Sequence, residues 1–153
     1  MLLAVDTFLF LKLVHVSAVI VAVGANVSYA YWLRRAGSDR ERLVDAINGI
    51  RGLDRRVANP AYVVVLLTGL AMAMTGPFTF DLPWIRAALG LYVFIVIFGI
   101  GIYAPTMRWQ LAEAERDPTS PAYRTAARRS SLFGLVAVGI VGVILVLMVT
   151  KPV

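Results

Sequence analysis

The sequence predicts an all-α fold, an integral membrane four-helix antiparallel bundle that forms a single domain over residues 1–153. Of the 153 residues, 59% are apolar, whereas soluble domains have ~45–50%. Four apolar segments are each long enough to cross ~30 Å of hydrocarbon at ~1.5 Å per residue. The arginines concentrate in two connections between these segments. The predicted spans are approximately 8–33, 57–75, 83–107 and 132–150.

The first span contains the only histidine of the chain, His15. Its far end carries Tyr29, Tyr31 and Trp32, aromatic rings of the kind that lie at the headgroup layer. Arg34 and the residue after it, also arginine, end the apolar run. This segment is therefore interpreted as a complete membrane-spanning helix.

The connection that follows is polar and basic. Ser38 and Glu41 have the spacing of a capping box, which predicts a short helix starting there. Three apolar residues recur there at helical spacing: Leu43, Ile47 and Ile50. This helix is expected either to lie along the bilayer surface on these residues or to be a solvated connector.

Prolines and tryptophans mark the limits of the later spans. Asn59-Pro60 is interpreted as the start of the second span, because Asn caps helices and proline is tolerated in the first turn. Only a short loop separates this span from the third, so the two are expected to be antiparallel neighbours. Trp84 and Trp109 are expected at the two interfaces of the third span.

The distribution of charge predicts the topology. Twelve of the fifteen basic residues lie in the two long connections, and short basic connections face the cytoplasm. We therefore expect a bacterial inner membrane protein, multi-pass, with loops 34–56 and 108–131 cytoplasmic and both termini outward.

Composition excludes several classes of function. The pI of about 10.2 is explained by topology rather than nucleic acid, since a bilayer-embedded chain offers no aromatic and basic platform. The chain has no cysteine, which excludes disulfides and thiolate sites. Asp6 and Asp81 are expected at the outer margin and all other acids in the cytoplasmic connections, which disfavours a proton-coupled transporter. No Ser/His/Asp constellation indicates a hydrolase, and no catalytic residue is assigned.

One face of the first span combines small and polar residues. On a helix of about 100° per residue they fall within about 60° of one another, with Lys12 at the margin. Such a face packs against protein or a cavity. We call the following residues the polar stripe: His15, Ala18, Ala22, Asn26 and Tyr29. Asn26, Tyr29 and Thr68 are candidates for hydrogen bonds between helices.

His15 has two interpretations. It is either a neutral imidazole hydrogen-bonded to a neighbouring helix, or a ligand to haem iron or another metal. Lys12 snorkels to the outer surface or, with His15, holds an anionic group such as a porphyrin propionate. Arg86 lies at the same outer level and either joins them or anchors the third span at the interface.

Six glycines in the last two spans are interpreted first as sites of close helix packing, and otherwise as clearance for a cofactor. They are Gly90, Gly99, Gly101, Gly134, Gly139 and Gly142.

Several short motifs carry a family resemblance. They are Phe10-Leu11-Lys12-Leu13-Val14-His15, Gly24, Asn59-Pro60-Ala61, Leu67-Thr68-Gly69-Leu70, Pro83-Trp84-Ile85-Arg86-Ala87 and Pro105. Over most of its length the chain resembles a family of small bacterial four-helix predicted integral membrane proteins. It is more distantly similar to membrane-type protoporphyrinogen oxidases and copper-resistance D-type proteins.

The resemblance to the oxidases implies a role for His15 in binding b-type haem. It also implies a lysine in the third span that oxidase activity requires, and Ala88 occupies the matching position. The oxidase activity is therefore not expected here. With one histidine, a haem would be five-coordinate or would take a further ligand from a methionine, a partner or a second copy.

Two functions remain open. The first is a structural or accessory subunit that packs, through small-residue faces, against other membrane protein subunits or against itself in the lipid bilayer. The second is a redox or porphyrin-binding protein that uses His15 with Lys12 and Arg86. The missing lysine and the missing second ligand favour the first.

Overall fold

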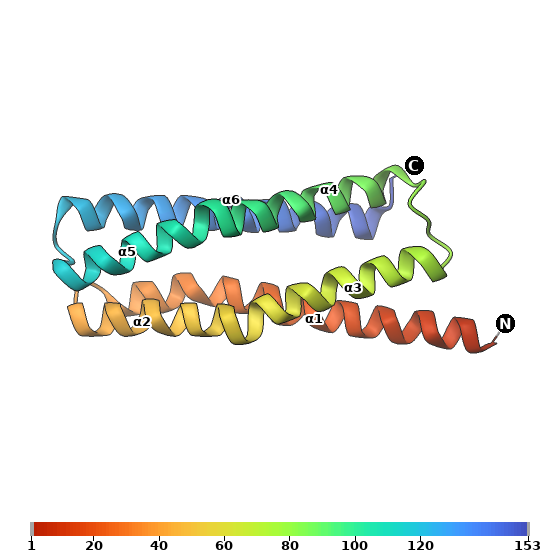
Figure 1. Ribbon diagram of the computed structural model, residues 1–153, viewed down its shortest axis with the longest axis horizontal. Coiled ribbons are helices and arrows are strands. Elements are labelled where there is room, and N and C mark those ends of the chain that lie inside the picture. Colours follow the sequence, from red (N-terminus) through yellow and green to blue (C-terminus); the bar gives the residue numbers. More distant parts are fainter. Residues whose placement is uncertain (1, 153) are drawn as a thin grey trace.

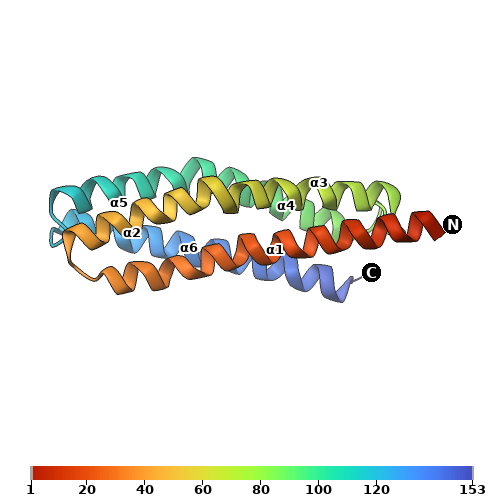
Figure 2. The same cartoon turned by 90° about the horizontal axis from the view of Figure 1, so that it is seen from below.

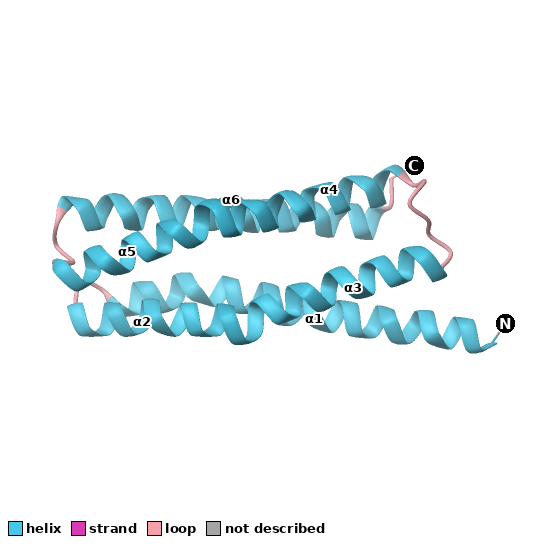
Figure 3. Cartoon of the chain, viewed as in Figure 1, coloured by secondary structure: helices cyan, strands magenta, loops and turns pink. Residues whose placement is uncertain are grey.

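The computed structural model describes the backbone of residues 2–152 and the side chains of residues 7–152. Met1 and Val153, the ends of the predicted domain, lie outside the described residues. The described chain is made of helices and short connections and contains no strand (Figure 3). Four continuous helical rods are long and apolar enough to cross a membrane, which confirms the predicted all-α four-helix bundle.

The rods are assembled from eight helical elements. The first is α1 (Leu2–Ala36), and the last is α6 (Pro121–Thr150). The second rod joins α2 (Arg40–Leu53), η1 (Asp54–Ala58) and α3 (Asn59–Thr75). The third joins α4 (Pro83–Phe98), η2 (Gly99–Tyr103) and α5 (Ala104–Arg116).

The two ends of the bundle differ in charge. Both termini and the connection 76–82 lie at one end, the terminal end, as Figure 1 shows. The turns 37–39 and 117–120 lie at the other, which we call the arginine-rich end (Figure 1). The second rod has 36 residues, or about 54 Å of helix. Because this exceeds ~30 Å of hydrocarbon, the helices extend beyond the predicted spans at the arginine-rich end.

The rods pair into two hairpins (Figure 2). In the first hairpin α1 packs along α3, and in the second α4 and α5 pack along α6. The two hairpins contact each other mainly where α2 meets α5. Toward the terminal end α3 and α4 move apart (Figure 1), and the Tyr92 hydroxyl, 2.7 Å from the Tyr62 carbonyl oxygen, links them.

The helix α3 begins at Asn59 with Pro60 in its first turn, as predicted, but no break precedes it and Asn59 does not cap it. Asn59-Pro60 lies inside the second rod, directly after the π-helical turn η1, in which the Asn59 N–H donates to the Asp54 carbonyl five residues back. Proline has no N–H and its ring crowds the preceding turn, so the helix continues through a local π turn. Pro105 follows η2 in the same way, where Ala104 N–H donates to Gly99.

The second rod begins one residue later than the capping-box prediction. The N-cap is Asp39, whose carboxylate accepts a 3.0 Å hydrogen bond from the Arg42 N–H. Gly37 has a φ of 62°, a conformation that glycine adopts without steric cost. The chain therefore reverses immediately after α1, and Ser38 forms part of the turn rather than the cap.

A hydrophobic core joins the hairpins at the arginine-rich end. Leu43, Ile47 and Ile50 are 1%, 0% and 2% exposed and pack with Met107 and Leu111 of α5. The expectation that the three α2 residues lie on the bilayer surface was wrong. Since α2 also bears exposed charges, it is an amphipathic helix. This part of the bundle therefore resembles the core of a soluble helical protein.

The six glycines of the second hairpin do not pack against helices of this chain. A Cβ added at any of them would meet no atom within 4 Å. The first interpretation of these residues, as close-packing sites, is therefore wrong within a single chain. Gly90, Gly101, Gly139 and Gly142 are exposed on the outer surface of the second hairpin.

Candidate functional site

His15 faces α3 and is half-buried there. Its Nδ1 lies 2.9 Å from Thr68 Oγ1, and Thr68 in turn donates its hydroxyl proton to the Val64 carbonyl at 2.6 Å. A hydroxyl has one proton to donate, so Thr68 accepts the Nδ1–H of His15. The second ring nitrogen, Nε2, then carries the lone pair.

Gly69 provides the space for the imidazole. A Cβ at this position would lie 3.3 Å from His15 Cε1 and 3.7 Å from His15 Nδ1. Any larger residue would force the ring to move. Thr68 and Gly69 thus form a two-residue seat that fixes the orientation of the ring, as the partners of metal-ligating histidines do.

The two cations considered alongside His15 lie on different hairpins. Lys12 is exposed on α1, and Arg86 is exposed on α4. These helices do not pack against each other in the described chain, because α1 packs on α3 and α4 packs on α6. Ala88, at the position of the oxidase lysine, is 1% exposed in α4.

The rest of the polar stripe lies against the second rod of the same chain. Ala22 is fully buried and Ala18 is half-buried. Asn26 donates to the Tyr62 hydroxyl, and Tyr29 donates a 2.6 Å hydrogen bond to Asp54 Oδ1. The hydrogen-bonding side chains of the polar stripe therefore find partners within the first hairpin.

Asp54 is the site residue that sequence reasoning missed. It was expected in the connection between the first two spans. The structure places it in the π turn η1 of a continuous helical rod, half-buried, against Tyr29. The available signal was Tyr29, a hydroxyl at the inner end of the stripe that required an acceptor. Asp81, by contrast, is exposed at the terminal end beside Thr79, and the side chain of Asp6 lies outside the described residues.

No group of three or more potential metal-ligating His, Cys, Asp or Glu side chains occurs in the described part of the chain. Within the described residues, His15 is therefore not part of a metal centre built from three such side chains.

This geometry defines an all-helical integral membrane protein with four spans and a single oriented histidine between the first two. The chain belongs to the family of predicted integral membrane proteins DUF2269, whose model matches residues 9–152. No curated protein and no solved structure matches it. The similarity to oxidases and copper-resistance proteins stays a prediction.

Proposed function

We propose that the protein is a structural or accessory subunit that packs through the outer face of its second hairpin. This proposal rests on the exposure of α6. In the most apolar 18-residue stretch of this helix, 0% of the residues are buried within the chain. Small residues let helices approach closely in lipid, where packing and lipid entropy drive association.

The face is shaped by two glycines and their neighbours. Gly139 and Gly142 are exposed one helical turn apart, and Leu135 and Val146, 70% and 59% exposed, flank them. The glycines leave a shallow depression between larger side chains. A facing helix, from another subunit or a second copy, would fit its own ridge there.

The test compares the size of the complex extracted from native membranes in mild detergent. Gly139→Leu with Gly142→Leu fills the depression and is expected to release a monomer. Gly24→Leu is the matched control, because Gly24 is exposed with open Cβ space on α1. A monomer in the unmodified protein, or a complex that survives the double substitution, contradicts the proposal.

A second candidate, haem or porphyrin binding, is favoured by the orientation of His15. The Nδ1–H is bound by Thr68, which leaves Nε2 as the nitrogen that would ligate iron. Haem supplies one-electron redox chemistry when bound. His15 would hold the iron, and Lys12 on the same helix would face a propionate.

The visible spectrum of the purified protein tests this candidate. A haem band that disappears in His15→Ala and shifts in Thr68→Val supports it, because Thr68 sets the basicity of the ligand. A colourless protein, or a band unchanged in His15→Ala, contradicts it.

For topology, we propose that the arginine-rich end is cytoplasmic in a bacterial inner membrane. The support is the concentration of twelve of fifteen basic residues toward that end. C-terminal fusions test it: alkaline phosphatase should be active and green fluorescent protein dark. The reverse pattern would place both termini in the cytoplasm.

A further inference from the structure

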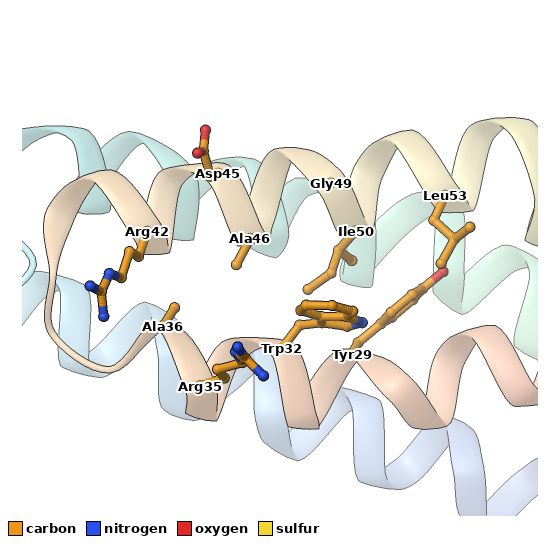
Figure 4. Close-up of a pocket in the computed structure, with 10 residues that line it drawn as sticks. All are labelled: Tyr29, Trp32, Arg35, Ala36, Arg42, Asp45, Ala46, Gly49, Ile50 and Leu53. Carbon is orange, nitrogen blue, oxygen red and sulfur yellow. The ribbon is translucent and has the colours of Figure 1, made fainter.

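A groove of about 700 Å³ lies between the last turns of α1 and the facing side of α2, at the arginine-rich end. Figure 4 shows its side chains. The walls come from two helices that are joined by the short turn 37–39. Since α2 packs on both α1 and α5, the groove is open on the remaining side.

The floor and deep end of the groove are apolar. Ala36, Ala46, Ile50 and Leu53 line it, and the ring of Trp32 lies against this floor (Figure 4). Tyr29 lies at the deep end, where its hydroxyl is already bound to Asp54. The inner part of the groove is therefore suited to hydrocarbon.

The mouth of the groove is cationic. Arg35 from α1 and Arg42 from α2 line it. Figure 4 shows Arg42 beside the turn, and the guanidinium of Arg35 on the side of Trp32. Neither forms an ion pair with any carboxylate among the side chains that the structure describes. Arg35 makes one hydrogen bond, to the Tyr31 hydroxyl at 3.2 Å, which leaves most of its five donors available.

Asp45 is the only acidic residue of the lining, and it does not neutralise the mouth. Figure 4 shows its carboxylate pointing away from the groove. The groove therefore combines two arginines at its entrance with an apolar interior. Arginine matches phosphate oxygens with paired donors.

The position of the groove fits the membrane interface. Tyr31 and Trp32 are half exposed near the end of α1, as aromatic residues are at the headgroup layer. From Arg35 to Tyr29 the helix rises about 9 Å, so the two ends of the groove are separated by roughly the length of a few methylene groups of an acyl chain. A lipid entering the groove would meet the arginines with its phosphate and the apolar floor with its acyl chain.

We propose that this groove binds an anionic phospholipid. The phosphate lies between Arg35 and Arg42, and the first part of an acyl chain runs over Ile50 toward Leu53. The negative lipid is preferred to a zwitterionic one because the site offers two unpaired guanidinium groups and no ammonium-binding carboxylate.

The first test measures lipid binding by native mass spectrometry of the full chain in detergent. It uses phosphatidylglycerol and phosphatidylcholine as probes. We expect phosphatidylglycerol to bind at least about tenfold more tightly, and Arg35→Gln with Arg42→Gln to weaken its binding by about tenfold to thirtyfold. The control, Arg40→Gln with Arg51→Gln, removes the same charge from exposed positions of α2 outside the groove.

The second test keeps every charge and fills the groove. Gly49 lines it and has open space at its Cβ position, whereas Gly52, three residues on, has open space but does not line it. Gly49→Leu should weaken phosphatidylglycerol binding by about tenfold, and Gly52→Leu should leave it unchanged. Thermal unfolding of both variants verifies that they are folded.

Three outcomes would overturn the proposal. Equal binding of the two lipids excludes charge selection. Equal losses in the Arg35/Arg42 and Arg40/Arg51 variants assign the effect to net charge rather than to the groove. Displacement of the lipid by excess inorganic phosphate would make this a site for a free anion, whereas a lipid site keeps its acyl-chain contacts and resists displacement.

Discussion

The two hairpins are held together by different chemistry. The first is joined by polar side chains at three levels, His15 with Thr68, Asn26 with Tyr62, and Tyr29 with Asp54. The second is joined by aromatic contacts, in which Phe98 meets Phe133 edge to face and Arg129 lies over the Trp109 ring.

The hairpins also differ in how they use small residues. Both hairpins bury alanines, Ala22, Ala58, Ala61 and Ala73 in the first and Ala88, Ala114 and Ala126 in the second. The difference lies in a glycine: Gly69 of the first hairpin lies against His15, whereas the six glycines of the second remain open to the surroundings. Small residues in a span therefore mark close packing, but only their polar neighbours show whether the partner helix belongs to the same chain. A hairpin whose polar groups are paired internally needs no partner on that face.

The largest effect is expected where the hairpins join. Ile47→Ala removes a fully buried side chain from the core of the arginine-rich end, which should cost about 2–5 kcal/mol of unfolding free energy. Val57→Ala, at a 36% exposed position of the same rod, is the control and should cost much less. Unfolding in detergent with increasing denaturant measures both. Equal destabilisation would show that Ile47 is not a core residue.

The next effect concerns Tyr29 and Asp54. Asp54→Ala leaves the hydroxyl of the buried Tyr29 without its acceptor, and the expected loss is about 1–3 kcal/mol. A double-mutant cycle with Tyr29→Phe measures the coupling, because each single variant removes the same hydrogen bond. Asp54→Asn keeps an acceptor oxygen and should retain most of the stability. Additive single effects would mean that the two side chains do not interact.

This pair also shows what sequence could and could not predict. Hydropathy and charge were sufficient for the fold class and the order of the spans, and the 100° pattern placed the stripe correctly on one face. Asn59-Pro60 was interpreted as a helix start because proline favours that position. A π turn that carries the helix past Pro60 leaves no hydropathy signal, so Asp54 was assigned to a connection.

His15 illustrates the same limit at finer scale. One of its two interpretations was a hydrogen bond to a neighbouring helix, and Thr68 was among the residues considered for such bonds. The contribution of Gly69 depends on a 3.3 Å approach, which no periodicity reveals. Likewise, a glycine motif has the same appearance in sequence whether it faces a helix of its own chain or another molecule.

Glycine substitutions test the difference between the two hairpins through a smaller effect. Gly69→Ala forces the His15 ring to shift and should destabilise the first hairpin by about 0.5–1.5 kcal/mol. Gly90→Ala meets nothing within 4 Å and should stabilise α4 slightly, since alanine favours helix. Paired thermal unfolding curves measure the difference. Equal shifts of the thermal unfolding midpoint in the two variants would contradict the proposed difference between the hairpins.

The smallest effect lies in the turn 117–120, outside the spans. Hydrogen bonds from the Thr119 hydroxyl, at 2.7 Å, and from the Thr119 N–H, at 2.8 Å, lower the pKa of Asp117 below 3.8. A lowered pKa means that this stabilisation is present above the ordinary value and is lost as pH falls through the folded value. As the solution is acidified through this range, the thermal midpoint should fall slightly less for Asp117→Asn than for the unmodified protein. An identical pH profile in both proteins would show that the turn makes no pH-dependent contribution.

The most direct test of the second hairpin as the packing surface is photo-crosslinking in native membranes. The photoreactive residue is placed on one hairpin at a time. Leu135 and Val146 sample the glycine face of α6, and Ile20 and Val63, 67% and 56% exposed, sample the first hairpin. Adducts to protein are expected from the two α6 positions and adducts to lipid alone from the other two. Protein adducts of equal yield from both hairpins, or from neither, would contradict the assignment of the second hairpin as the packing surface.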